Sequence, residues 1–368
     1  MKYISAYFNI MKATPDFNNL VYVDGFAGRG TYDGDDGEEI PGSPLRALQV
    51  FASDEELSSR VTSCFIEKDA VLYQDLQRSL DSFYEQNQGI RKPHSYNEAF
   101  STVMNALLDG VIKDGKTLAP AFVFIDPCGV DGVDFAVADR ILRSQRRAEL
   151  FIFFNIEGVR RILGLGDKMG PTLGNLLGSK DRAEELLGIV RALDGAAKRE
   201  EAIISYYEGL LRTQTPARFV VSFRVEKEDR RITSHYLVHA SQHPLGFGIM
   251  KDVMWSVGRT AEGKGGLVLE QASISGMEAM FTPSQDAIEA SVLAELKEGV
   301  KPVSYFYTTL AQLPDNRLCE RAYRTALLAL EAAGKLQVLD KGGVGLAPKR
   351  PMRNGALTLG KDYYVRRV

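Results

Sequence analysis

The ten residues from Val21 to Gly30, VYVDGFAGRG, constrain the fold of this chain more than any other stretch. They predict a short apolar strand that ends in an acid, Asp24, and then breaks into a tight turn. Gly25, Gly28 and Gly30 leave the backbone of that turn bare, because glycine has no side chain to block an approaching ligand. A strand followed by such a turn is typical of the nucleoside-binding edge of a Rossmann-like sheet.

The turn also fits the pattern acid-x-Phe-x-Gly-x-Gly, which runs from Asp24 through Phe26 to Gly30. This pattern resembles the one in class I methyltransferases that depend on S-adenosylmethionine (SAM), especially those that modify nucleic acid. A dinucleotide-binding turn needs a third glycine for close packing of the next helix, and position 33 is Asp33. The turn therefore favours SAM over NAD as the expected cofactor.

Apolar runs after the turn predict more strands that alternate with helices. Ala121 to Ile125 is apolar without alternation, as a parallel strand covered on both faces should be. The other expected strands are Val61 to Ile66, a weak strand at His94 to Tyr96, Leu150 to Phe154, and a closing hairpin of Arg218 to Glu226 and Ile232 to Ala240. An antiparallel hairpin after alternating strands and helices distinguishes a methyltransferase sheet from a dehydrogenase sheet. The expected fold class is therefore α/β, with a Rossmann-like class I methyltransferase sheet.

The spacing of apolar residues also predicts the helices that cover this sheet. A helix is expected from Gly42 to Phe51, with Ser43 as its N-cap and Pro44 at its first position. The acidic stretch Thr31 to Pro41 predicts an exposed loop, with a lid as one interpretation. Further helices are expected over residues 3–12, 70–87, 100–111 and 244–255, and in segments between 155 and 211.

Polar side chains follow the second and third strands and are candidates for binding the nucleoside. Glu67 comes directly after Val61 to Ile66, where a carboxylate can accept both hydroxyl hydrogens of a ribose. A surface glutamate at a strand end is the simpler alternative. Asn97 and Glu98 follow the weak strand, where they would either contact the edge of the adenine ring or only cap a turn.

The strand Ala121 to Ile125 ends in Asp126, Pro127, Cys128 and Gly129, at the sheet edge where methyltransferases of this class meet their substrate. We expect Asp126 and the backbone around Pro127 to hold the acceptor. Amino-methyltransferases place a stacking aromatic in this element, and its absence here argues against methylation of a base amine.

Cys128 follows a proline, as does the nucleophile of cytosine carbon-5 methyltransferases. The glutamate-containing partner motif of those enzymes is not evident, and a buried, inert cysteine is the simpler expectation. The three cysteines lack CxxC spacing, so neither a disulfide framework nor a zinc site is expected. His235 and His239 would share a strand face about 13 Å apart, too far to bind one metal ion.

The C-terminal part changes from alternating elements to a helical pattern. Expected helices at Gln285 to Glu298, Tyr305 to Ala311 and Cys319 to Ala333 precede an apolar strand from Lys335 to Leu339 and a turn at Gly342-Gly343. This order predicts a winged-helix domain over residues 284–368, after a methyltransferase-like domain over residues 1–258 and a linker over residues 259–283.

In a winged helix the third helix can enter the major groove of DNA, and Arg317, Arg321 and Arg324 lie just before or on it. From Pro283 onward the chain has 13 Lys plus Arg against 9 Asp plus Glu, although the whole chain has a net charge of −3. These arginines are therefore candidates for contacting DNA or RNA phosphates, and a protein-docking surface is the alternative.

Five stretches together resemble the three-Cys-motif partner family (TcmP) over roughly residues 1 to 260. They are YVDGFAGRG, GSPLRAL, CFIEKD, FVFIDPCG and LVHASQHPLGFGIMKDVMW. The resemblance implies a methyltransferase-like domain, SAM as cofactor, a partner with a cysteine motif, and an origin in mobile or defence-associated bacterial loci. Family members often have an aromatic where this chain has Cys128, which weakens the cysteine-nucleophile interpretation further.

Two main hypotheses follow. In the first, the chain is a SAM-dependent methyltransferase acting on nucleic acid, with Asp24 and the glycines holding the methionine part of SAM. In the second, it is a non-catalytic SAM- or nucleotide-binding partner subunit, which the Cys128 departure motivates. A nucleotide-dependent enzyme of another class is a third interpretation. The N-terminal residues lack an apolar run long enough for a signal peptide, so we expect a cytoplasmic protein.

Overall fold

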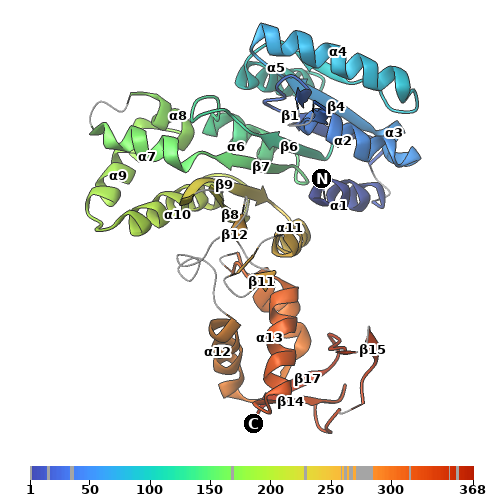
Figure 1. Ribbon diagram of the computed structural model, residues 1–368, viewed down its shortest axis with the longest axis vertical. Helices are drawn as coiled ribbons and strands as arrows, with labels where there is room; N and C mark the ends of the chain where they lie inside the picture. Colours follow the sequence, from blue (N-terminus) through green and yellow to red (C-terminus); the bar gives the residue numbers. More distant parts are fainter. Residues whose placement is uncertain are drawn as a thin grey trace. The chain divides into compact units, whose positions relative to one another are not determined.

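The computed structural model describes residues 2–14, 17–33, 37–166, 170–227, 230–257, 259–260, 263–264, 268–270, 285–314, 316–347, 349–353 and 356–368. The chain divides into two compact units (Figure 1). The first comprises residues 1–222 and 233–246, and the second comprises residues 223–232 and 247–368. The expected linker over residues 259–283 falls for the most part outside the described residues.

The first unit is built on a twisted sheet whose strand order is β5-β4-β1-β6-β7-β9-β8. Its strands are β1 (Leu20–Asp24), β4 (Val61–Ile66), β5 (His94–Tyr96), β6 (Ala121–Ile125), β7 (Glu149–Phe154), β8 (Phe219–Lys227) and β9 (Arg230–Ser241). From β5 to β7 every pairing is parallel, whereas β9 pairs with β7 in the antiparallel direction. This is the Rossmann-like sheet of class I methyltransferases, so the predicted fold class is confirmed.

The register of β1 sets the position of the sheet's carboxyl edge. Asp24 lies level with Phe65 of β4 and with Phe124 of β6. Glu67 and Asp126 each lie two residues beyond these partners, so they flank Asp24 on its two sides. Parallel pairing therefore places three acids from distant parts of the chain at one edge.

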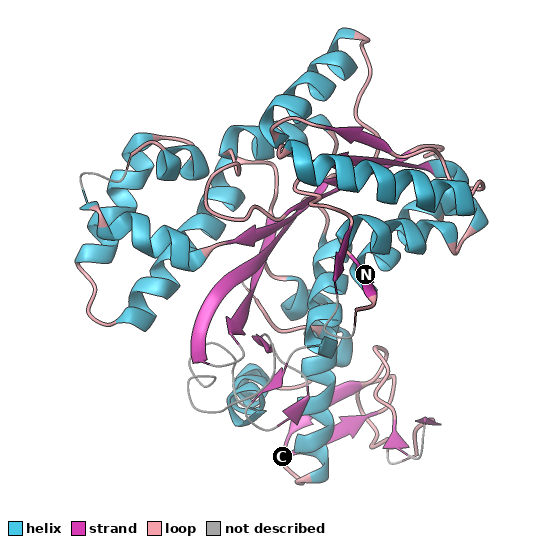
Figure 2. Ribbon diagram, turned by 45° about the horizontal axis from the view of Figure 1, so that its top comes forward, coloured by secondary structure: helices cyan, strands magenta, loops and turns pink. Residues whose placement is uncertain are grey.

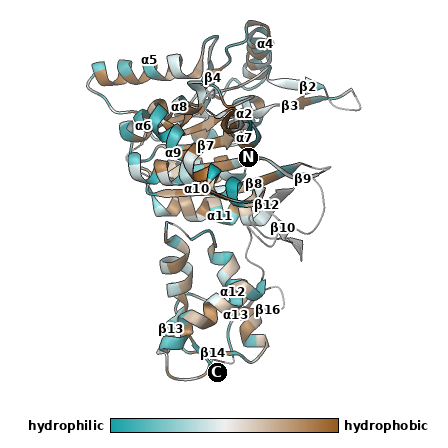
Figure 3. Ribbon diagram, turned by 90° about the vertical axis from the view of Figure 1, so that its left-hand side faces the viewer, coloured by the Kyte–Doolittle hydropathy of each residue, from teal (hydrophilic) through white to brown (hydrophobic). Residues whose placement is uncertain are grey.

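Helices cover both faces of this sheet, as Figures 1 and 2 show. On one face, rings from β1, β6 and two helices pack together, with Tyr22 contacting both Phe51 and Phe122 and Phe8 contacting Phe51. The other face forms an apolar core with α5, α6 and the helices that follow β7. Figure 3 shows the hydrophobic colour concentrated along strands such as β7. Burial on both faces explains why the strands read as continuous apolar runs.

The helices of the first unit are α1 (Lys2–Lys12), α2 (Ser43–Ala52), α3 (Glu55–Arg60), α4 (Ala70–Gln86), α5 (Phe100–Lys113), α6 (Phe135–Ser144), α7 (Ile156–Gly164), α8 (Thr172–Leu177), α9 (Lys180–Arg191), α10 (Ala196–Gln214) and α11 (Pro244–Val257), the last of which continues into the second unit. The apolar stripe of α1 is buried as predicted. Helices α3 and α6 were not predicted from the sequence; α3 is short and has few apolar residues.

Two local predictions near the glycine turn were wrong. Ser43 is not the N-cap of α2: Gly42 holds that position, and the Ser43 hydroxyl donates a 2.6 Å hydrogen bond to Asp24 instead. The acidic stretch after the turn is not a plain loop, because β2 (Thr31–Asp33) and β3 (Glu39–Pro41) pair as an antiparallel hairpin. Turn chemistry alone did not reveal these short strands, whose side chains are mostly exposed.

A buried carboxylate, Glu149 at the start of β7, joins four segments of the first unit. The Tyr3 hydroxyl of α1 donates a hydrogen bond to it, the Ser241 hydroxyl donates another at 3.0 Å, and the imidazole Nε2 of His239 lies 3.0 Å away. A Cβ atom on Gly246 would lie only 2.0 Å from its Oε1 atom, so the start of α11 needs glycine there. Glu149 therefore anchors α1, β9 and α11 to the sheet.

The second unit contains α12 (Gln285–Glu295), α13 (Glu320–Ala332) and a three-stranded sheet of order β13-β17-β14. Its strands are β13 (Lys301–Pro302), β14 (Leu336–Leu339) and β17 (Tyr364–Arg367). Between β14 and β17 in the sequence, β15 (Met352–Arg353) and β16 (Ala356–Leu357) pair with each other as a separate two-stranded sheet. Of three further short strands, β10 (Arg259–Thr260) pairs with β11 (Gly263–Lys264) and with β12 (Val268–Glu270), and β12 pairs with β8. The expected α-helix at Tyr305 to Ala311 is instead a π-helical turn followed by a 3₁₀ turn.

A buried lysine organises part of the second unit. The Lys251 ammonium of α11 donates hydrogen bonds to the carbonyl oxygens of Ala311, Asn316 and Leu318, the last two at 2.8 and 2.9 Å. Its nitrogen also lies 4.1 Å from the centre of the Phe247 ring. Burial lowers the pKa of Lys251 to about 8.

Among the described helices, none combines the length and the apolar composition needed to cross a membrane.

We expect Glu149→Ala to destabilise the chain by about 3 kcal/mol or more, because Tyr3, His239 and Ser241 each lose a buried hydrogen-bond partner. Glu149→Gln should cost less, since the amide oxygen can still accept. Urea unfolding followed by circular dichroism measures both. The control is Glu55→Ala at an exposed position of α3, with an expected change within about 0.5 kcal/mol. Equal midpoints for Glu149→Ala and the control would contradict this role.

Candidate functional site at the carboxyl edge

The glycine turn after β1 is hydrogen-bonded to the strands on both sides of it. The Gly25 amide donates to the carbonyl oxygen of Phe124 in β6, and the Ala27 amide donates to that of Ile66 in β4, both at 2.9 Å. The Gly28 amide donates to the Glu67 carboxylate, also at 2.9 Å. The turn is therefore held in one conformation before any ligand arrives, which lowers the entropy cost of binding.

Two glycines of the turn are required by backbone geometry. Gly28 has φ of 63° and Gly30 has φ of 86°, both in the left-handed region that favours glycine. A Cβ on Gly25 would also lie 2.6 Å from the Phe100 ring. The sequence pattern thus corresponds to a turn that other residues cannot form without strain.

Asp24 is fully buried at the end of β1. One carboxylate oxygen accepts the 2.6 Å hydrogen bond from the Ser43 hydroxyl, and the other lies 3.4 Å from the Phe26 amide nitrogen. The pKa of Asp24 is raised to about 7, mainly by burial and to a smaller extent by the nearby carboxylates of Asp126 and Glu67, while the hydrogen bonds from Ser43 and Phe26 act in the opposite direction. This acid therefore changes its protonation state near neutral pH.

Glu67 and Asn97 lie together beside the turn. Besides the Gly28 amide, the Glu67 carboxylate accepts a 2.8 Å hydrogen bond from the Asp69 amide. The Asn97 side-chain amide donates to the carbonyl oxygens of Glu67 and Lys68, at 2.9 and 3.1 Å. Asn97 therefore fixes the segment that carries Glu67, while Glu67 is half-buried and keeps lone pairs for a hydroxyl.

Asp126 lies on the opposite side of Asp24 from Glu67 and is half-buried. Burial raises its pKa to about 6. No described residue donates a hydrogen bond to its carboxylate, in contrast to Asp24 and Glu67. A half-buried carboxylate without a protein partner at the edge of a sheet is available to accept a hydrogen bond from a ligand.

The two residues after Asp126 lie in different environments. Pro127 is buried, whereas Cys128 is exposed, so the expectation that Cys128 is a buried cysteine was wrong. The reason is that the chain leaves the sheet immediately after Ile125, and Val130 and Val133 fill the space beneath the loop instead.

The Phe26 side chain turns away from the bare backbone of the turn. Its ring lies 5.7 Å from the Phe100 ring, and a Cβ on Gly132 would approach it to 2.9 Å. Phe26 therefore packs the glycine turn against α5 and the loop after β6, and only its backbone remains for a cofactor.

Tyr32 of β2 lies over the turn, although nothing in the sequence pattern predicts it there. Its hydroxyl oxygen would be 2.5 Å from a Cβ on Gly28, and its ring would be 2.9 Å from one on Gly42. Partial burial raises the pKa of Tyr32, as do the nearby Asp24, Asp126 and Cys128. Tyr32 thus brings an aromatic ring to the site that the Cys128-Gly129 sequence lacks, and only the hairpin pairing reveals this.

The other predicted site residues lie elsewhere. Arg321 and Arg324 are on the exposed side of α13, where Arg324 pairs with Glu320 and stacks on Tyr307, and Arg317 lies in the preceding loop. His239 is buried in the Glu149 cluster, and His235 stacks on Phe153. The described residues contain no group of three His, Cys, Asp or Glu side chains suited to a metal ion.

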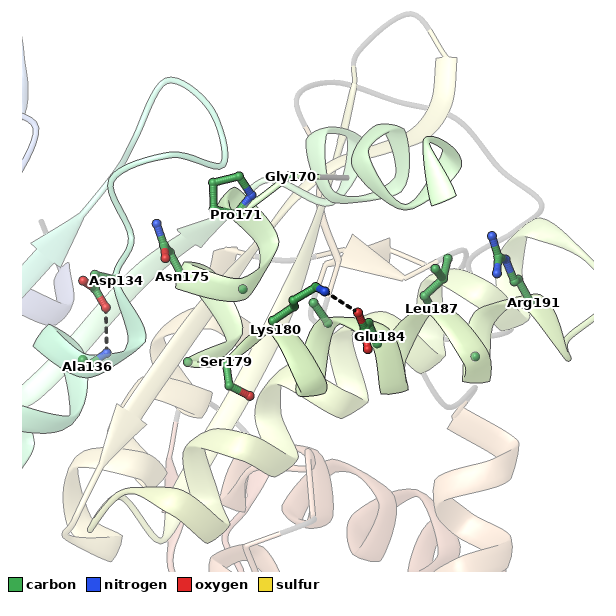
Figure 4. A pocket seen from close by; sticks show the side chains of 14 residues that line it. Asp134, Ala136, Gly170, Pro171, Asn175, Ser179, Lys180, Glu184, Leu187 and Arg191 are labelled. Carbon is green, nitrogen blue, oxygen red and sulfur yellow. Dashed lines mark hydrogen bonds and ion pairs between the residues drawn. The ribbon is translucent and has the colours of Figure 1, made fainter. Parts of the chain in front are cut away.

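A cavity of about 760 Å³ lies beside α8, α9 and the start of α6 (Figure 4). Several of its polar groups already have partners: Asp134 accepts from the Ala136 amide, Ser179 accepts from the Arg182 amide, and Lys180 pairs with Glu184 at 3.1 Å. Because these groups cap helices or form an ion pair, this cavity contributes no chemistry to the acid cluster.

Because Asp24 has a native pKa of about 7 and an ordinary value near 3.8, the folded state holds a proton that the unfolded state loses between these values. The contribution of Asp24 to the free energy of unfolding therefore falls as pH rises through this window. We expect Asp24→Asn to gain about 2 to 3 kcal/mol of stability relative to the parent chain between pH 5 and pH 8. Urea unfolding at both pH values measures this.

The matched control is Asp33→Asn, which changes an exposed acid of the neighbouring hairpin. Its stability relative to the parent chain should not vary between the two pH values. A stability difference for Asp24→Asn that is the same at pH 5 and pH 8 would show that Asp24 is not the buried titrating acid.

No family model and no curated protein matches the sequence. Solved structures match at low similarity. A Legionella pneumophila protein of the DUF519 family is 12% identical, with a TM-score of 0.40 over 69% of this chain and 90% of that one. A Geobacter sulfurreducens methyltransferase is 11% identical, with a TM-score of 0.29 over 66% and 79% of the two chains. A precorrin-6y C5,15-methyltransferase from Geobacter metallireducens is 10% identical, with a TM-score of 0.26 over 64% and 87%. At these values the similarities do not establish a function.

Proposed function

We propose that this chain is a SAM-dependent methyltransferase that acts on nucleic acid. The observation that carries the proposal is the meeting of Asp24, Glu67 and Asp126 around a fixed glycine turn, at the carboxyl edge of a sheet with an antiparallel β9. Ligands of open α/β sheets bind at this edge.

The residues present fit SAM. The positive-φ glycines expose backbone for the methionine part, and the buried Asp24 carboxylate lies beneath it. Glu67 has lone pairs for the ribose hydroxyls, and Tyr32 offers a ring above the turn. When bound, SAM supplies an electrophilic methyl group on a positively charged sulfur, to which nearby carboxylates are electrostatically complementary.

Asp126 positions the acceptor in this proposal. Its carboxylate accepts no hydrogen bond from the described residues, and with a pKa of about 6 it is mostly ionised above neutral pH. In that state it accepts a hydrogen bond from an N–H or O–H group and so orients the lone pair of that atom toward the methyl group. Methyl transfer gains most of its rate from such alignment. The exposed Cys128 takes no part.

Nucleic acid as the acceptor is supported by the second unit. Helix α12, strand β13, a helical turn, helix α13 and strands β14 and β17 follow in the order of a winged helix, with β17 between its two partners. The exposed Arg321 lies on α13, which is the helix that enters the major groove in such domains. We propose this domain as the source of affinity for DNA or RNA phosphates.

The motifs around the turn and Asp126 support membership of the three-Cys-motif partner family as part of this proposal. The missing aromatic at Cys128 favours a second candidate function, a non-catalytic SAM-binding subunit of a cysteine-motif protein. The two candidates share the cofactor pocket and differ in whether Asp126 serves catalysis.

Isothermal titration with SAM tests the pocket. We expect Asp24→Asn and Glu67→Gln each to weaken SAM binding at least about tenfold, because each removes a charge that interacts with the cofactor. In the parent chain binding should tighten from pH 6 to pH 8 as Asp24 loses its proton, and Asp24→Asn should flatten that dependence. Glu55→Gln on the exposed face of α3 is the control. Wild-type affinity in both site variants would refute this pocket.

Transfer of a tritiated methyl group from SAM to mixed DNA and RNA tests the reaction. We expect Asp126→Asn to lower kcat about a hundredfold or more while SAM affinity stays unchanged, since the residue orients the acceptor and not the cofactor. Cys128→Ala should remain active, which separates this mechanism from a cysteine nucleophile. SAM binding without transfer to any nucleic acid would favour the non-catalytic candidate.

A further inference from the structure

A second pocket, of about 540 Å³, lies at the edge of the sheet opposite the candidate site. It is lined by Arg146, Arg147, Pro216, Arg218, Phe219, Gln242 and His243. These residues come from the segment before β7, the segment before β8, and the segment after β9. Pairing of Glu149 with Ser241 brings the first and last of these segments together.

The distance along β7 separates this pocket from the acid cluster. Strand β7 runs for 6 residues from the pocket side to the carboxyl edge, which corresponds to about 20 Å. A ligand in this pocket therefore does not occupy the proposed SAM site.

The pocket concentrates positive charge that no described residue neutralises through an ion pair. Three arginines and a histidine line it, and none of its described lining residues is acidic. None of the three guanidinium groups forms an ion pair with a described residue, although the Arg147 group lies 5.0 Å from the centre of the Phe17 ring. Guanidinium groups that line one pocket repel one another, and an anion bound among them relieves that repulsion.

Hydrogen bonds fix the backbone that carries these arginines. The side-chain amide of Gln242 donates hydrogen bonds to the carbonyl oxygens of Leu142 and Gln145, at 2.6 and 3.0 Å. The Gln145 side chain donates to the Leu118 carbonyl at 2.6 Å and accepts from the Arg147 amide at 3.2 Å. The Tyr7 hydroxyl donates to the Arg147 carbonyl at 2.7 Å. The arginines therefore extend from a preorganised frame, which reduces the cost of ordering them on binding.

The size and lining of the pocket point to a ligand class. A volume of about 540 Å³ is larger than a single phosphate needs and falls in the usual range for small-molecule sites. Several guanidinium groups suit more than one phosphate, because each can bind phosphate oxygens in a bidentate manner. The Phe219 ring and the planar guanidinium groups provide surfaces on which an aromatic base can stack.

We propose that this pocket binds a nucleoside di- or triphosphate, with Arg146, Arg147 and Arg218 on the phosphates and Phe219 against the base. This site is separate from the proposed methyl-donor site and does not depend on methyl transfer. The chain thereby has a second ligand-binding site, which lies at the amino edge of the sheet.

Isothermal titration of the full chain with ATP in the absence of SAM tests the proposal. We expect saturable binding that weakens at least about tenfold in Arg147→Gln and in Arg218→Gln, because each loses charge-assisted hydrogen bonds to phosphate. The matched control is Arg143→Gln, a nearby exposed arginine that already pairs with Asp139 at 2.8 Å, and it should bind ATP normally. Thermal melting of each variant confirms that it is folded.

Further arms separate this pocket and this ligand from the alternatives. Asp24→Asn should bind ATP normally, and excess SAM should not displace ATP, because the glycine turn is not involved. Pyrophosphate should bind more weakly than ATP, since it lacks the base, and adenosine should not bind measurably.

Four results would overturn the proposal. They are no ATP binding by the parent chain, normal ATP binding by both arginine variants, displacement of ATP by SAM, and pyrophosphate binding as tight as that of ATP. A single-stranded oligonucleotide that binds at these arginines while ATP does not would likewise replace it with a nucleic-acid surface. The ATP titrations are made without SAM, so they test this pocket even if the chain does not bind SAM.

Discussion

The parallel pairing of β1 with β4 on one side and β6 on the other is the constraint on which the candidate site depends. It brings the ends of three strands to one edge, so that Asp24, Glu67 and Asp126 become neighbours although they are far apart in the chain. The turn then closes over this edge through amide hydrogen bonds to both neighbouring strands. Without that register the three acids would carry no common chemistry.

The three acids differ in burial and in hydrogen-bond partners, and so in the role that each can have. Asp24 is fully enclosed and has hydrogen-bond partners within the protein, Glu67 is tied to the turn, and Asp126 is half-buried with no described donor. Burial raises the pKa of Asp24 to about 7 and that of Asp126 to about 6. Among these acids, the carboxylate without a described donor is the one best placed to receive a substrate, which is why we assign acceptor binding to Asp126.

The antiparallel strand β9 connects the two edges of the sheet. Through Ser241 and His239 it holds Glu149 at the amino edge, where the same segment continues into the arginine-lined pocket. The buried Glu149 cluster thus supports the frame of that pocket as well as the attachment of α1. Packing in this part of the first unit therefore supports the proposed arginine-lined site at the amino edge, away from the proposed SAM site at the carboxyl edge.

The sequence by itself determined the fold class of the sheet, the glycine turn and the acids at the strand ends, because apolar runs, glycine spacing and strand-terminal carboxylates are local signals. It did not reveal Tyr32 over the turn, the hydrogen bond from Ser43 to Asp24, or the exposure of Cys128. Nor did it reveal the arginine-lined pocket, whose members lie in three separate segments. Only the tertiary structure decided these features, since each depends on which distant segments pack together and on how much water remains between them.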